Sequence, residues 1–230
     1  MCGRYTLTDS GSHDLAQRFA ADFDERGIQP SLLGRANIAP SQEVVAVAGD
    51  GAHGAGRRMV AAKWGLTPHW AERPMINARD DKLTGPWRGL ASRAGHRALI
   101  PATGWLEWLR TEDRRRAPQP FHCVPGDGTP VAFAGLYDAR SDTCLIVTTA
   151  ARGECARVHD RMPAVLAGAA AEAAWLSAEV DLGDACALVT DGLIEPMRVA
   201  PVDPKLNAAD AEGLELLMPP PPQPEQLTLG

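Results

Sequence analysis

Apolar residues along this chain fall mostly into short runs, separated by polar stretches that contain Gly and Pro. A further apolar stretch, residues 96–108, is broken at 101–104 by Pro-Ala-Thr-Gly, which predicts two short strands around a bend. Residues 76–79 form one more short extended segment. The main runs have the length of buried strands and lie at residues 44–47, 59–66, 121–124, 131–137 and 144–149.

Helical spacing is confined to two segments. Leu15, Phe19 and Phe23 recur at intervals of four and predict a helix over 13–26, and the Ala-rich residues 169–178 predict another. Many short strands with two or three helices favour an α+β fold: one domain over 1–218 with a closed or nearly closed sheet. We interpret residues 37–40 as an extended entry into a strand. The loops expected are a Gly-rich turn at 49–56, a charged hairpin tip at 110–119 and a mobile, Pro-rich tail at 219–230.

The composition is that of an ordinary globular protein, with 45% hydrophobic and 23% charged residues in 230. No run of 18 apolar residues predicts a membrane span, and the first residues lack the apolar run of a signal peptide, so we expect a cytoplasmic protein. Five cysteines without a C-x-x-C pair argue against a disulfide framework. Scattered histidines and the absence of a phosphate-binding motif predict neither a metal nor a cofactor.

The net charge of −6 hides an uneven distribution. Residues 1–116 hold 17 Lys and Arg against 13 Asp and Glu, whereas residues 117–230 hold 6 against 16. The total argues against a protein that coats nucleic acid non-specifically, but the basic half allows a local groove lined by arginine. A coding sequence rich in G and C would favour arginine over lysine without any structural reason.

Cys2 carries the most distinctive chemistry. Removal of Met1 would leave a terminal cysteine whose thiol and α-amine have reference pKa values of about 8.5 and about 7.7–8. Such a 1,2-aminothiol condenses with an aldehyde to an imine, and the thiol then closes a thiazolidine ring. It can also serve as an N-terminal nucleophile for amide cleavage. The alternative is a cysteine at position two without a role.

Two further segments hold groups suited to proton transfer and anion binding. Glu107 stands between Trp105 and Trp108, where desolvation would raise its pKa and suit it to general acid catalysis; the alternative is a strand glutamate that points to water. His159 and Arg161 would share one face of an extended segment, a pair suited to a phosphodiester. The alternative there is an ordinary polar loop.

The segment around residues 64–79 offers weaker signals. Asn77 and Arg79 alternate like His159 and Arg161, and the Asn77 amide can hold an amine or a carbonyl. Trp70 follows a turn shaped by Pro68 and can stack on a base, although a core tryptophan is an equal alternative.

Taken together, these segments resemble the SOS response-associated peptidase (SRAP) family of abasic site processing proteins. The resemblance rests on blocks that occur in the family's order from residue 2 to about 207. They are residues 1–5 (MCGRY), 37–41 (NIAPS), 64–66 (WGL), 77–79 (NAR), 99–102 (LIPA), 104–108 (GWLEW), 133–137 (FAGLY), 159–163 (HDRMP) and 201–202 (PV).

The resemblance implies a single SRAP-type α+β domain, with short mixed and antiparallel strands in a barrel-like sheet flanked by a few helices. It implies a protein that senses abasic sites in single-stranded DNA and forms a thiazolidine crosslink through Cys2, as a monomer and without cofactor or metal; the crosslinked protein would lie on the nucleoid. The catalytic residues would be Cys2, Asn77, Glu107 and His159. The DNA-binding residues would be Arg4, Asn37, Pro40, Trp70, Arg79 and Arg161.

The chain departs from the family pattern at Asp81, where a glutamate is common, at Ala98, where a cysteine is common, and in the pair before Glu107. These departures concern substrate preference and supporting contacts.

Two rival functions stay open: a cysteine-type peptidase or autopeptidase that uses Cys2 as nucleophile with Glu107 and His159, and a non-covalent reader of damaged or modified DNA.

Overall fold

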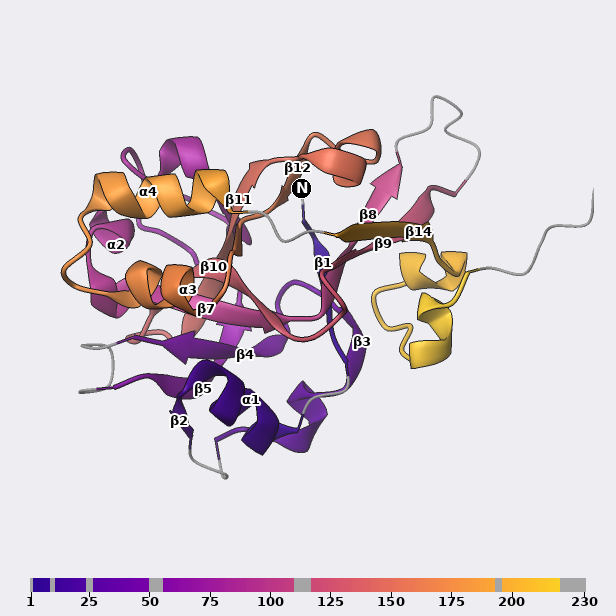
Figure 1. Ribbon diagram of the computed structural model, residues 1–230, viewed down its shortest axis with the longest axis horizontal. Coiled ribbons are helices and arrows are strands. Elements are labelled where there is room, and N and C mark those ends of the chain that lie inside the picture. Colours follow the sequence, from indigo (N-terminus) through magenta and orange to yellow (C-terminus); the bar gives the residue numbers. More distant parts are fainter. Residues whose placement is uncertain are drawn as a thin grey trace, which may run out of the picture.

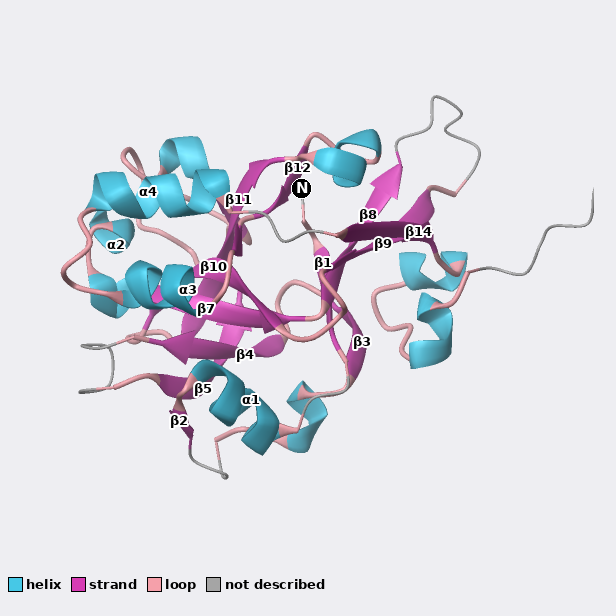
Figure 2. Cartoon of the chain, viewed as in Figure 1, coloured by secondary structure: helices cyan, strands magenta, loops and turns pink. Residues whose placement is uncertain are grey.

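The computed structural model describes residues 2–8, 11–23, 27–49, 56–109, 117–192 and 196–219. In these parts of the chain the strands form two sheets, and helices lie on their outer faces (Figures 1 and 2). This α+β architecture is the predicted one.

Five strands of the larger sheet form a closed ring. Neighbours pair in the order β11-β10-β7-β4-β5, and β11 pairs again with β5 at Thr143–Lys63 and Cys144–Trp64. The second pairing joins the two ends of the path, which confirms the barrel-like sheet. The ring strands are β4 (Glu43–Ala48), β5 (Arg58–Trp64), β7 (Arg97–Ala102), β10 (Val131–Asp138) and β11 (Thr143–Ala150), and β2 (Asp22–Phe23), β6 (Asn77–Arg79), β12 (Arg161–Pro163) and β13 (Val165–Leu166) pair at its margins.

The smaller sheet is antiparallel and has the order β14-β9-β8-β1-β3. In this sheet the first strand of the chain, β1, lies between β8 and β3. Its strands are β1 (Arg4–Leu7), β3 (Arg35–Ile38), β8 (Gly104–Leu109), β9 (Gln119–Pro125) and β14 (Met197–Pro201).

Aromatic side chains join the two sheets in the core. Tyr5 from β1 meets Trp64 and Phe133 of the ring at centroid distances of 5.4 and 6.1 Å, and Trp105 from β8 meets Phe133 at 5.9 Å. All four side chains are fully buried and packed edge to face, an arrangement that aromatic quadrupoles favour. The cluster therefore fixes where β1 and β8 stand relative to the ring.

The helices cover the ring from outside, with α3 packed on β7 and α4 on β11 (Figure 2). A partly buried ion pair holds α1 to α3: Arg18 donates to both carboxylate oxygens of Glu172, at 3.0 and 2.6 Å. The α-helices are α1 (Ser12–Phe19), α2 (Arg88–Ala91), α3 (Ala169–Leu176) and α4 (Leu182–Asp191). The 3-10 segments are η1 (Pro30–Leu32), η2 (Asp80–Lys82), η3 (Ala94–His96), η4 (Gly153–Arg157), η5 (Pro204–Asn207) and η6 (Leu214–Leu217).

The helix predicted over 13–26 is too long. Ala20 adopts a left-handed conformation (φ 47°) and caps α1, so Phe23 lies on β2 and pairs with β5. The predicted strands and the helix at 169–178 are confirmed, with boundaries shifted by a few residues. Helix α4, β1 and β14 were not predicted. Most of the turn at 49–56, of the hairpin tip at 110–119 and of the tail at 219–230 lies outside the described residues.

In the described part of the chain, no helix combines the length and the apolar character needed to cross a membrane.

Candidate functional site

Cys2 lies where the two sheets meet. It directly precedes β1, its side chain is fully buried, and its Sγ is 3.7 Å from the Arg4 carbonyl oxygen. The Cys2 carbonyl accepts a 2.8 Å hydrogen bond from Asn77 Nδ2 on β6 of the larger sheet.

The side chain of Asn77 uses one of its polar atoms to bind Cys2 and leaves the other, Oδ1, without a partner among the described residues. The residue is 7% exposed, and parallel pairing with Ile146 on β11 fixes its backbone. Its Oδ1 is buried and has no hydrogen-bond partner among the described residues. Because buried acceptors are normally satisfied, an acceptor placed beside Cys2 suits a hydroxyl or N–H of a bound molecule.

Glu107 owes its burial to the alternation of β8. Trp105 and Glu107 share one face, Trp105 against Phe133, whereas Leu106 and Trp108 face the other way, toward the C-terminal segment. The sequence suggested that Trp105 and Trp108 both pack against the Glu107 carboxylate. In the structure the two tryptophans lie on opposite faces of β8. Burial nevertheless raises the pKa of Glu107, while the charge of His159 acts in the opposite direction.

The Cys2 thiol is protonated at neutral pH. Burial is the main cause that raises its pKa well above the ordinary value, and the negative charge of Glu107 adds to it. A thiol of this kind needs a base before it can attack. The carboxylate of Glu107 is within electrostatic reach for that task.

His159 stands at the far side of the site, just after η4. Its backbone N–H donates to the Cys155 carbonyl at 3.1 Å, and its side chain is 8% exposed. A hollow of about 300 Å³ beside it is lined by Leu109, Ala156, Val158, His159 and Asp160. The face of β8 that carries Glu107 therefore continues through Leu109 into open space next to His159.

Arg4 and Asn37 are engaged with the C-terminal segment. Arg4 donates to Asn37 Oδ1 at 2.8 Å and to the Leu206 carbonyl at 3.1 Å, and it lies over the Trp108 ring. Asn37 is fully buried and donates to the carbonyls of Ala208 and Ala211. These bonds tie Asn37 to the C-terminal segment, and its role in DNA binding stays a prediction.

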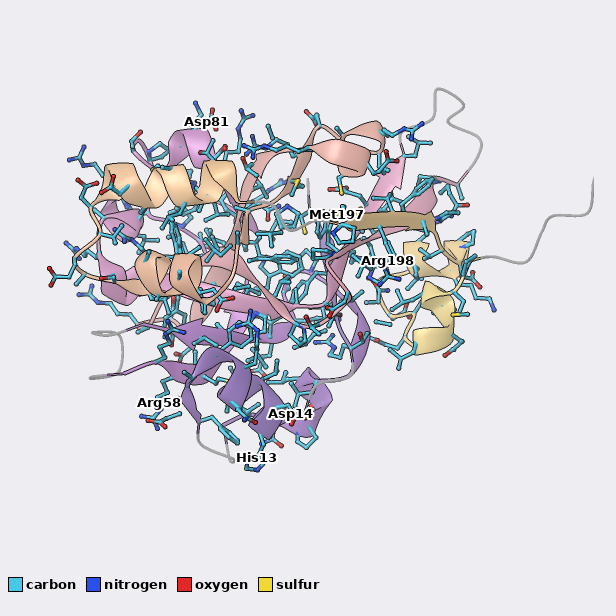
Figure 3. The ribbon with its side chains drawn as sticks, in the orientation of Figure 1. His13, Asp14, Arg58, Asp81, Met197 and Arg198 are labelled. Carbon is cyan, nitrogen blue, oxygen red and sulfur yellow. The ribbon has the colours of Figure 1, made fainter. Side chains whose placement is uncertain are left out.

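The arginines near His159 differ in accessibility. Arg79 is 54% exposed and is bound by both oxygens of Asp81, whose side chain lies at the outer surface (Figure 3). Arg161 is 12% exposed and donates to Asp80 and to Thr148. Arg161 therefore does not extend freely on the same face as His159, as the alternation of an ideal strand predicts. The roles of Arg79 and Arg161 in DNA binding stay predictions.

Trp70 lies in a hollow apart from the catalytic candidates. Trp70 is 44% exposed and packs edge to face on Trp87, in a hollow of about 410 Å³ that also contains His69 and Arg140. None of the four catalytic candidates lines that hollow. Pro40 is half-buried.

Sequence reasoning missed several neighbours of the site. Asn207 accepts from the Trp108 indole at 2.5 Å and donates to the Pro118 carbonyl, so it closes a second hollow beside Arg4. A hydrogen bond with Cys155 raises the pKa of the Cys123 thiol, and the negative charges of Glu107 and Cys2 raise it further. No local pattern announced these residues, because each comes from a distant part of the chain. The described residues contain no group of three or more His, Cys, Asp or Glu side chains placed to hold a metal ion.

A buried thiol at the start of the chain, beside a buried carboxyl group and an imidazole, defines a site for nucleophilic and proton-transfer chemistry. The sequence model of the SOS response associated peptidase (SRAP) family matches residues 1–209, and the chain belongs to this family.

Curated relatives include the abasic site processing proteins YoaM of Bacillus subtilis (34% identical, covering 73% of this chain and 75% of the relative) and YedK of Escherichia coli (30%, 95% and 100%). A solved protein from Bacteroides thetaiotaomicron has the same fold, with a TM-score of 0.77 at 18% identity, covering 95% of this chain and 100% of its own.

Proposed function

We propose that this protein processes abasic sites in single-stranded DNA by forming a covalent crosslink through Cys2 once Met1 has been removed. The observation that carries the proposal is a fully buried Cys2 whose carbonyl is held by Asn77, next to a buried Glu107 with a raised pKa. The names of the relatives, abasic site processing proteins, support the same assignment.

The reaction begins at the amine. The ring-opened deoxyribose of an abasic site carries an aldehyde, and the free α-amine of Cys2 attacks its carbon. The resulting carbinolamine loses water and becomes an imine. The thiol sulfur then adds to the imine carbon while its proton passes to the nitrogen. The balance is one aldehyde plus one aminothiol giving one thiazolidine and one water.

The protonation states favour this order of steps. A protonated Glu107 can donate its proton to the sugar ring oxygen during ring opening and take up the proton that leaves the anomeric hydroxyl. It can then donate again, to the departing hydroxyl of the carbinolamine. The carboxylate that remains can then take the proton of the Cys2 thiol, whose raised pKa keeps it neutral until that moment. His159 assists proton transfer near the sugar or the flanking phosphate, and Asn77 Oδ1 accepts from the amine or from a sugar hydroxyl.

Two surface hollows support a path for the DNA strand past the site. One hollow lies beside Arg4 and Trp108 and the other beside Leu109 and His159, so β8 separates two places for the strand on either side of the lesion. The exposed guanidinium of Arg79 is available to phosphate, in exchange with Asp81.

The cysteine peptidase is less well supported. A peptidase nucleophile needs a thiolate, and cysteines with that role usually have a lowered pKa. Burial and Glu107 both raise the pKa of Cys2. The amine-first reaction tolerates a neutral thiol, and the thiolate-first reaction does not.

The test is a crosslinking assay on purified protein whose intact mass confirms loss of Met1. An oligonucleotide with one abasic site is added without reductant, and products are resolved on a denaturing gel. We expect a heat-stable one-to-one adduct with wild type and none with Cys2→Ala. Cys2→Ser should give an adduct only when borohydride traps its imine. Cys186→Ala, which changes a thiol on α4, is the matched control and should react like wild type. A wild-type protein without Met1 that forms no adduct would refute the proposal.

A further inference from the structure

The Asp80 carboxylate lies among donors of the kind that bind phosphate. Asp80 is the first residue of η2 and directly follows β6. Its Oδ1 accepts a hydrogen bond of 2.8 Å from Arg161 Nη2, and its Oδ2 accepts one of 2.7 Å from the Thr149 hydroxyl. A guanidinium and a hydroxyl are also the donors that proteins direct at DNA phosphates. In the free protein, a carboxylate therefore holds donors that can hold a phosphate.

This cluster adjoins the candidate active site. Asn77, which donates to the Cys2 carbonyl, begins β6, and Asp80 follows the end of that strand. Three residues of extended chain span at most about 11 Å. A DNA strand whose abasic site reaches Cys2 therefore brings a flanking phosphate close to the cluster.

Arg161 does not depend on Asp80 alone for its position. The same Nη2 donates to the Thr148 carbonyl and lies 3.3 Å from Thr148 Oγ1, and backbone pairing of Arg161 with Ala150 holds β12 on β11. Arg161 Nε is buried and has no hydrogen-bond partner among the described residues. The guanidinium therefore keeps an anchor when Asp80 is displaced, and acceptors within the protein do not use all of its donors.

Asp80 is a strong competitor because its pair is shielded from water. The side chains of Arg161 and Asp80 are 12% and 15% exposed. Burial acts to raise the pKa of Asp80, but the hydrogen bonds from Arg161 and Thr149 outweigh it and lower that pKa, so the carboxylate is charged at neutral pH. A phosphate must displace a full negative charge to reach these donors.

The next residue of η2 repeats the arrangement at the surface. Asp81 binds Arg79 through both oxygens, and the Lys82 amine lies 3.6 Å from its Oδ2 (Figure 3). All three side chains are about half exposed, so water and salt weaken this pair. Two neighbouring acids are thus matched with two arginines expected to bind DNA, and Asp80 belongs to the shielded pair.

We propose that Asp80 is a specificity-determining residue that competes with DNA phosphate for Arg161 and Thr149 and so keeps the binding of undamaged single-stranded DNA weak. The inference rests on the proposed function, because it concerns the same DNA strand. Weak non-covalent binding leaves capture to the abasic aldehyde, which undamaged DNA lacks. The exchange makes and breaks no covalent bond: the carboxylate leaves the guanidinium and the hydroxyl, and a phosphate takes its place.

Binding of undamaged DNA is measured by fluorescence anisotropy with a labelled, unmodified single-stranded oligonucleotide. Asp80→Asn keeps the shape of the side chain and one acceptor oxygen but removes the charge. We expect this variant to bind about fivefold more tightly than wild type at low salt. The plot of log affinity against log salt concentration should become steeper by about 0.7, the change expected when one further phosphate is neutralised and releases its counterions.

Two control variants remove a negative charge elsewhere. Asp14→Asn changes an exposed residue of α1, on the other side of the molecule from Asp81 in Figure 3, and should bind like wild type. Glu154→Gln also frees an arginine, Arg157, from an ion pair, but this pair is exposed and weak. We expect it to change the affinity less than about twofold.

A double variant tests whether the gain passes through Arg161. Combining Asp80→Asn with Arg161→Gln should abolish the fivefold gain, because the guanidinium that Asp80 releases is then missing. The crosslinking assay measures the consequence for specificity. An excess of undamaged strand should slow the crosslinking of abasic DNA more strongly in Asp80→Asn than in wild type.

The outcomes separate the two claims. Equal or weaker binding of undamaged DNA by Asp80→Asn would overturn the role of Asp80, and so would a full gain in the double variant or no measurable binding by any variant. If Asp80→Asn binds more tightly as expected but wild type without Met1 forms no adduct, the proposed crosslinking fails and the competition by Asp80 stands. If wild type forms the adduct but Asp80→Asn binds undamaged DNA like wild type, only the role of Asp80 fails.

Discussion

Among the residues that the structure describes, the two buried glutamates are buried in different ways. Glu172 on α3 is fully buried and receives two hydrogen bonds from Arg18 on α1. Glu107 on β8 is 4% exposed and lies within electrostatic reach of the Cys2 thiol and the His159 imidazole. One carboxylate is matched by a fixed cation, and the other is surrounded by groups that can exchange protons.

The difference teaches how burial can serve either structure or chemistry. A guanidinium beside a carboxylate favours the charged form and joins two elements through a geometry that suits both partners. Burial raises the pKa of Glu107 although the charges of the N-terminal amine and of His159 act in the opposite direction, and such a carboxyl group costs stability at neutral pH but supplies an acid and a base in turn. Replacing each glutamate by glutamine removes the charge and keeps the shape of the side chain, so the two sites can be tested separately.

The largest effect is expected on crosslinking. Glu107→Gln keeps the shape of the side chain, but the amide can act neither as a general acid nor as a general base. The crosslinking rate should therefore fall about 100-fold or more. Glu172→Gln, the matched change elsewhere in the core, should keep the wild-type rate at a temperature where it is folded. Single-turnover assays on denaturing gels measure both. Equal rates in wild type and Glu107→Gln would remove proton transfer from the role of Glu107.

The second effect is on stability. Glu172→Gln leaves the Arg18 guanidinium without its counter-charge, and we expect a loss of about 2 kcal/mol, below the range for a fully buried pair because Arg18 is 32% exposed. The melting temperature should fall by about 4–8 °C. Glu154→Gln, which breaks an exposed pair, should change it by less than about 2 °C. A loss equally small in Glu172→Gln would mean that the buried pair contributes little.

The smallest effect has the opposite sign. Because the folded state raises the pKa of Glu107, its contribution to stability is present below the ordinary glutamate pKa of about 4.3 and is lost as the pH rises through the raised value. Glu107→Gln should therefore melt about 2–4 °C above wild type at pH 7 and at the same temperature near pH 4. Thermal melts across this range measure the difference. A variant that melts lower at pH 7 would indicate that Glu107 is matched by a cation, as Glu172 is.

Local pattern explains why some elements were predictable and others were not. The strand at 131–138 is apolar almost throughout because both of its faces are covered, and such a run is easy to find. The helix after Ser12 was predicted too long because Phe23 continues the spacing of Leu15 and Phe19, while the left-handed turn at Ala20 has no signal in an alanine. The short strand β1 is visible only through its partners β3 and β8.

The candidate site divides in the same manner. The sequence alone selected Cys2, Asn77, Glu107 and His159, since each stands in a short block with recognisable chemistry. The bond from Asn77 to Cys2 confirms only that these two meet, because their roles stay predictions. The engagement of Asn37 with Ala208 and Ala211 could not be foreseen, because more than 170 residues of chain separate the donor from its acceptors.

By itself, the sequence determined the family, the strand-rich α+β class and the kinds of group that the site contains, because these follow from residue types and short spacings. Only the tertiary structure decided the protonation of those groups. The pKa of Glu107 depends on how completely the two sheets exclude water from its carboxyl group. Desolvation and hydrogen bonding act over a few ångströms in space, between residues far apart along the chain.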